Sequence, residues 1–63
     1  MLVFTDLCHN KHVINLSNVN NVVIRNNDGT HVITFHMPEH HVVPATVDIE
    51  TAKHIIDVLG DFK

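Results

Sequence analysis

Seven histidines in a chain of 63 residues are the side chains of this sequence most able to do chemistry. His9 and His12 flank a short polar turn, and a two-residue loop there would make them a cross-strand pair. Two imidazoles at that spacing could hold half of a Zn²⁺, Ni²⁺ or Cu²⁺ site, which Cys8, His40 or His41 would complete. The sequence contains no CxxC, no HxxxH on a helix and no HExxH. We therefore expect no bound cofactor, with zinc or nickel at His9 and His12 as the alternative.

Catalysis has little support in the remaining residues. Cys8 beside His9 suggests a nucleophile and its base, but adjacent residues of a strand point to opposite faces. The acids near the C-terminus, such as Asp48 and Glu50, are typical of a helix cap and a solvated helix face. The chain has no glycine-rich phosphate loop, and a chain this small does not readily enclose a pocket of about 300 Å³. We expect no enzymatic activity.

The charge and the distribution of apolar residues exclude two further classes of partner. The formal charge is −3 with only four lysines and arginines, too few to neutralise a phosphate backbone, so we expect no nucleic acid. No apolar run approaches the ~20 residues of a membrane span. The apolar start at Met1–Phe4 has no basic flank and is soon interrupted by Asp6, unlike a secretory signal. The single cysteine indicates a reducing compartment, so we expect a cytoplasmic protein that does not bind membranes.

The elements that must position these residues form one α+β domain covering residues 1–63. We expect a small antiparallel β-meander of four to five strands, packed against one C-terminal amphipathic helix. Pro44 restricts the last strand to a sheet edge or a bulge. The β-branched apolar runs and the helical periodicity place strands at about 2–7, 12–16, 20–26, 30–37 and 41–47, and the helix at about 49–59.

The register of the first hairpin stays open at this point. A two-residue Asn10-Lys11 loop would pair Leu7 with Ile14. A three-residue loop would pair Phe4 with Leu16. A one-residue slip exchanges the two faces of a strand, so the two registers predict different cores.

The second hairpin is better specified. Asp28-Gly29 between two β-branched runs is a strong signal for a two-residue turn. This loop pairs Ile24 with Ile33 and Val22 with Phe35. These four side chains share one face, which we expect the helix to cover.

The helix is expected to begin after Asp48 as N-cap and to end at Gly60 in the left-handed conformation. Its apolar residues span roughly half of the circumference, which is more than one small sheet requires. The extra width would cover the ends of the sheet or face a second subunit. The predicted interface residues are Ile55, Val58, Leu59 and Phe62.

The order of these elements resembles that of small bacterial proteins of the flagellar and swarming-motility type. The resemblance lies in the segments Leu7–Leu16, Val22–Phe35 and Ile49–Leu59. It implies a strand, a polar turn, a meander and a terminal helix. It rests on this pattern and carries no shared motif, so it implies no activity and no site residue.

The function expected from the sequence is that of a small non-enzymatic interaction or regulatory module. A domain of this size buries only roughly 60% of its unfolded surface, and it has no disulfide to stabilise it. We therefore expect a homo-oligomer such as a homodimer, a module that binds or inhibits a larger protein, or both. The alternative is a small histidine-rich protein that binds a transition metal.

Overall fold

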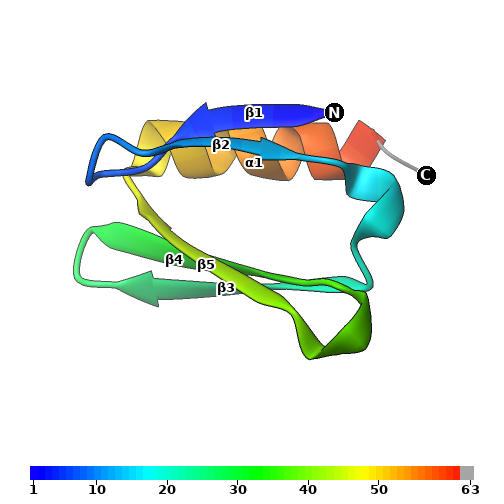
Figure 1. Cartoon of the computed structure of the whole chain (residues 1–63). Helices are drawn as coiled ribbons and strands as arrows, with labels where there is room; N and C mark the ends of the chain where they lie inside the picture. The colour runs from blue at the N-terminus through cyan, green and yellow to red at the C-terminus, as the bar shows by residue number, and fades with distance from the viewer. Residues whose placement is uncertain (62–63) are drawn as a thin grey trace.

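The computed structural model describes residues 1–61 and confirms the predicted α+β fold, an antiparallel β-meander with one C-terminal helix (Figure 1). The strands divide into two antiparallel sheets, one of β1 (Leu2–Thr5) and β2 (Lys11–Ile14) and the other in the order β3 (Asn21–Asn27), β4 (Thr30–His36) and β5 (Val42–Val47). A 3₁₀ turn at Leu16–Asn18 connects the two sheets, and a tight turn that includes Pro38–His40 connects the last two strands. The C-terminal helix is α1 (Ile49–Asp61).

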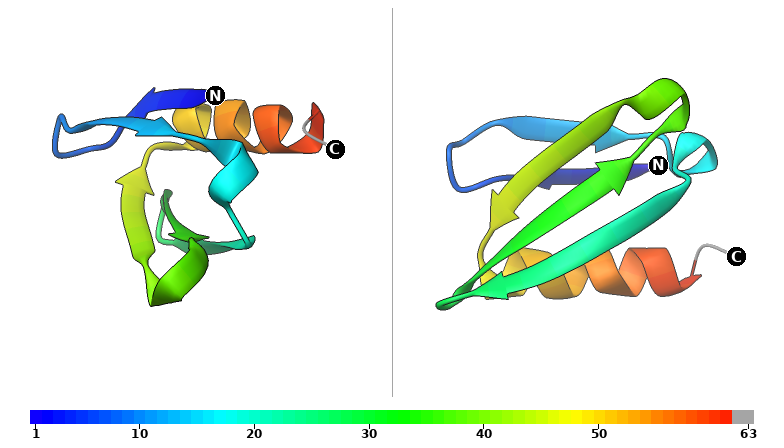
Figure 2. Two further views of the ribbon diagram at one scale, coloured as in Figure 1. Left: turned by 45° about the vertical axis from the view of Figure 1, so that its right-hand side comes forward. Right: turned by 90° about the horizontal axis from the view of Figure 1, so that it is seen from below.

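The two sheets and the helix form two layers. The three-stranded sheet is one layer, and the β1–β2 hairpin lies beside α1 in the other (Figures 1 and 2). The hairpin covers the β5 side of the sheet, and α1 covers the β3 side (Figure 2). A hydrogen bond of 2.9 Å from the Leu7 N–H to the Thr46 carbonyl joins the hairpin to the outer edge of β5. Each half of the covering layer therefore shields a different part of the sheet.

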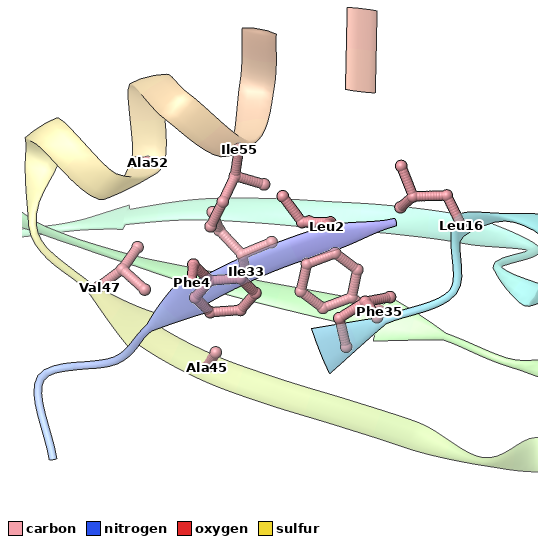
Figure 3. Packing of buried hydrophobic residues seen from close by; sticks show 10 residues of the cluster. Leu2, Phe4, Leu16, Ile33, Phe35, Ala45, Val47, Ala52 and Ile55 are labelled. Carbon is pink, nitrogen blue, oxygen red and sulfur yellow. The ribbon is translucent and has the colours of Figure 1, made fainter. Parts of the chain in front are cut away.

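The hydrophobic core lies between these layers and takes side chains from both (Figure 3). β4 is the central strand of its sheet, and its Ile33 and Phe35 are fully buried. The other buried residues are Leu2, Phe4, Ile14 and Leu16 from the N-terminal segment, Ala45 and Val47 from β5, and Ala52 and Ile55 from α1. Neither layer has enough apolar surface to enclose this core alone.

The first hairpin has neither of the two predicted registers. Its ladder pairs Leu2 with Ile14 and Phe4 with His12, and the turn spans residues 6–10. The physical reason is Asp6, whose Oδ1 accepts two backbone N–H groups from within the turn, each at 2.9 Å. A side chain that satisfies backbone donors stabilises a longer turn, so β1 ends at Thr5 and is shorter than predicted.

The second hairpin has the predicted register. Ile24 lies opposite Ile33 and Val22 opposite Phe35. Both residues of the Asp28–Gly29 turn have positive φ, 46° and 87°, as a type I′ turn requires. The helix layer does not cover this face evenly, because Val22 is only half-buried and Ile24 is 41% exposed. β3 is an edge strand, and burial decreases towards that edge.

α1 begins where the sequence predicts and ends later. Asp48 Oδ1 accepts the Thr51 N–H at 2.8 Å, which confirms the N-cap. Hydrogen bonding from the side chain of Thr51, and then from its N–H, lowers the pKa of Asp48. The prediction for Gly60 is wrong, because the helix continues through it to Asp61 and Gly60 does not have a positive φ. Glycine permits a left-handed residue but does not impose one.

The wide apolar face of α1 is partly explained by its two neighbours. The helix contacts β4 below it and β1 beside it, so it packs against both sheets. A helix that covered one small sheet alone would need a narrower apolar face. None of residues 1–61 belongs to a helix that is long and apolar enough to cross a bilayer.

Candidate functional site

The predicted metal ligands His9 and His12 do not form a cross-strand pair. His9 lies in the exposed turn with a φ of 68°, next to the exposed free thiol of Cys8. The His12 Nε2 instead donates to Asp6 Oδ2 at 2.8 Å, and its ring stacks on Phe4 with 4.8 Å between ring centroids. The His12 imidazole therefore helps to stabilise the turn.

The other predicted ligands are remote from this turn. His40 and His41 lie at the turn between β4 and β5, at the opposite end of the molecule from residues 6–10 (Figure 1). Within residues 1–61, no three His, Cys, Asp or Glu side chains gather in an arrangement that could hold a metal ion. The fold does not assemble the predicted donor set.

Asp6 organises the first turn electrostatically. Its Oδ1 accepts the N–H groups of Cys8 and Asn10, and its Oδ2 accepts from His12. The hydrogen bond from His12, followed by those from Asn10 and Cys8, lowers the pKa of Asp6 from 3.8 to about 2. The sequence signal for this role is an aspartate at the start of a polar turn. The cluster has a structural role, because its polar groups satisfy one another.

A second polar feature lies between the start of β3 and the β4–β5 turn. It is an open hollow of about 430 Å³. Glu39 and His40 beside it both have left-handed backbone, with φ of 63° and 65°. Its openness suits hydrogen bonding to a surface better than enclosure of a small molecule. No pattern in the sequence indicates this hollow. Its lining includes Asn20, Asn21, His36, Glu39, His40 and His41.

The outer edge of β3 presents unpaired backbone groups. In a hairpin with a two-residue loop, the residues that flank the loop form a hydrogen-bonded pair, here Asn27 and Thr30. The direction of the N–H and C=O groups alternates along a strand. Those of Val22, Ile24 and Asn26 therefore point away from β4, where the sheet has no further strand.

The opposite edge of the sheet, on β5, is blocked at two points. Pro44 lies opposite Thr34, and by the same alternation its nitrogen points outward, where a proline has no N–H to donate. The outward carbonyl of Thr46 already accepts the Leu7 N–H. Of the two edges of the three-stranded sheet, only the β3 edge is therefore free to accept a further strand within the described residues.

Exposed apolar side chains lie beside this free edge. At 100° per residue, Ile49 and Ile56 lie on one flank of the buried Ala52–Ile55 line, and Thr51 and Val58 lie on the other. Thr51 and Val58 are half-buried, whereas Ile49 and Ile56 are 51% and 46% exposed. The half-buried flank is therefore the one that lies towards the hairpin. The exposed flank therefore faces the β3 side. We call Val22, Ile24, Ile49 and Ile56, with the free edge, the β3–α1 surface.

The predicted interface residues lie largely elsewhere. Ile55 is fully buried in the core of its own chain, so it cannot offer surface to a partner. Val58 and Leu59 are half-buried and pack against that core. Phe62 lies outside the described residues. The helical period identified the apolar arc, but it did not show which part of the arc the first hairpin covers.

Comparisons with protein families, with curated proteins and with solved structures find no match for this chain.

Proposed function

We propose that this chain is a small, non-enzymatic protein-interaction module that binds another polypeptide through the β3–α1 surface. The observation that supports this most is the free β3 edge, since unpaired strand edges readily pair with another chain unless they are blocked. The edge has no proline and no bulge, and Arg25 is its one charged residue. We further propose that the module acts in the cytoplasm, where Cys8 stays reduced.

The apolar residues beside the edge strengthen the proposal. Ile24, Ile49 and Ile56 are each more than 40% exposed, although isoleucine is among the residues most often buried. A partner that covers them would gain apolar burial as well as backbone hydrogen bonds. Capture of a larger protein, which the module would regulate or inhibit, and pairing with a second copy are the two forms of this function.

Affinity capture from a lysate of the source organism, with the tagged full chain as bait, tests the function. We expect Ile24→Lys to lose the captured protein, because a lysine on an edge strand is a known protection against pairing. The matched control is Val13→Lys, which places the same charge on an exposed strand residue of the other sheet. Light scattering of the same three proteins detects self-association through the same surface.

The result that contradicts the proposal is equal behaviour of the two lysine variants. If Ile24→Lys and Val13→Lys capture the same proteins and have the same mass in solution as the unaltered chain, the β3–α1 surface is not the binding surface. Circular dichroism melts of both variants show whether each remains folded.

A further inference from the structure

We infer that the occupant of the β3–α1 surface is an extended segment of another polypeptide, which adds to β3 as a fourth strand beneath α1. This inference rests on the proposed function and specifies the chemistry and the conformation of the partner.

The position of α1 leaves room for a strand. Seen from below, α1 runs along the β3 side of the sheet, and the hairpin lies on the β5 side (Figure 2). A strand added to β3 would therefore continue the sheet under the exposed flank of α1, which carries Ile49 and Ile56. Every second side chain of that strand would face α1 and lie beside Ile24. These positions need apolar residues.

A single extended segment needs less room at this place than a second copy of this chain that pairs through its own β3. Pairing of β3 with β3 around a two-fold axis normal to the sheet keeps both helices on the same face. Because α1 lies on the β3 side, the two helices would then lie on the same face beside the joint. A segment without a covering layer of its own brings no second helix to this face.

The charge on β3 defines the opposite face of the added strand. Arg25 lies on the face away from α1, since Val22 and Ile24 share the core face and residues alternate. Arg25 has no acidic partner within residues 1–61. A cross-strand acidic residue would supply one. The partner segment is therefore an alternating sequence, apolar towards α1, with an aspartate or glutamate on the other face.

Selection from a library of random twelve-residue linear peptides displayed on phage tests this inference. The bait is the full chain, and peptides that also bind Ile24→Lys are removed by counter-selection. We expect the selected peptides to alternate apolar and polar residues, with an acidic residue at a polar position. In the complex, hydrogen exchange followed by NMR should slow at the N–H groups of Val22, Ile24 and Asn26. The N–H groups of Val23 and Arg25 already face β4 and should change little.

The possible results separate this inference from the function on which it rests. Selected peptides with helical spacing, or protection of amides away from the even positions of β3, would overturn strand addition. Strand addition would also be overturned if the selection gave no peptide whose binding depends on Ile24. If affinity capture still depends on Ile24 in any of these cases, the interaction function stands and only the strand-addition mode is wrong. If capture does not depend on Ile24 either, both fail.

Discussion

At the scale of single residues, Asp6 has a role that its place in the sequence only partly indicates. One carboxylate receives hydrogen bonds from two backbone N–H groups and from His12, and its side chain is only 11% exposed. His12 is thereby drawn towards the turn and stacks on Phe4. His12, one of the two predicted metal ligands, helps to hold the hairpin together.

The lowered pKa of Asp6 predicts how stability depends on pH. The folded state holds the pKa at about 2, below the ordinary 3.8, so the ionised carboxylate stabilises the fold above that ordinary value. This contribution is lost as the pH falls from 3.8 through about 2. We expect Asp6→Asn to lower the Tm at pH 7, and the difference from the unaltered chain to shrink below about pH 5. Thermal melts across this range measure the effect.

The control for this prediction is Asp57→Asn, which removes an exposed carboxylate on α1. It should change the Tm little at any of these pH values. A difference between Asp6→Asn and the unaltered chain that stays constant down to pH 2 would contradict the assigned role of the carboxylate.

At the scale of elements, the two glycines show what a local signal can and cannot specify. Gly29 has a φ of 87° in the turn, whereas Gly60 continues the helix without a positive φ. An added Cβ would meet no atom within 4 Å at either position, so backbone conformation decides the outcome. We expect Gly29→Ala to destabilise the chain by about 1–2 kcal/mol. Gly60→Ala should stabilise it by roughly 0.5–1 kcal/mol, and urea unfolding measures both changes.

Opposite signs for these two substitutions are the essential result. Destabilisation by Gly60→Ala would show that the helix ends before this residue in solution, as the sequence alone suggests.

The orientation of α1 makes a second prediction at this scale. Ile55 and Ile56 are adjacent in sequence, but Ile55 is fully buried and Ile56 is 46% exposed. Ile55→Ala should cost about 2–5 kcal/mol in the free energy of unfolding, because it leaves a cavity between the layers. Ile56→Ala should cost less than about 1 kcal/mol in the free chain. Chemical denaturation of the two variants compares them, and similar costs would contradict this orientation of the helix.

At the scale of the whole molecule, the two layers share one core. Phe4 from β1 lies against Phe35 from β4, with 5.9 Å between ring centroids, although the two residues are far apart in sequence. α1 contacts both sheets. The β1–β2 hairpin and the three-stranded sheet should therefore unfold together.

Phe4→Ala tests this cooperativity. Its expected cost of about 3–5 kcal/mol is comparable to the total stability of roughly 3–9 kcal/mol for a chain of this length. We expect the amide signals of both sheets to lose their dispersion together in NMR spectra. The control is Val3→Ala on the exposed face of β1, which should cost no more than about 0.5 kcal/mol. Survival of the β3–β4–β5 signals in Phe4→Ala would show that the sheets are independent.

The sequence by itself determined the features that depend only on residues close together in the chain. The register of the second hairpin follows from Asp28-Gly29, because few pairs of adjacent residues can both adopt a positive φ. The start of α1 follows from Asp48, because its side chain reaches only the next turn of backbone. The edge position of Pro44 follows from its missing N–H.

Only the tertiary structure decided which apolar surface is buried. Burial depends on residues that are distant in sequence and adjacent in space, so the 3.6-residue period of α1 could not show that β1 covers one flank and leaves Ile49 and Ile56 exposed. The division of the strands into two sheets and the free edge of β3 also depend on contacts between residues that are distant in sequence. The seven histidines lie on distant turns and strands and on α1. The β3–α1 surface, which we propose for binding, contains none of these histidines.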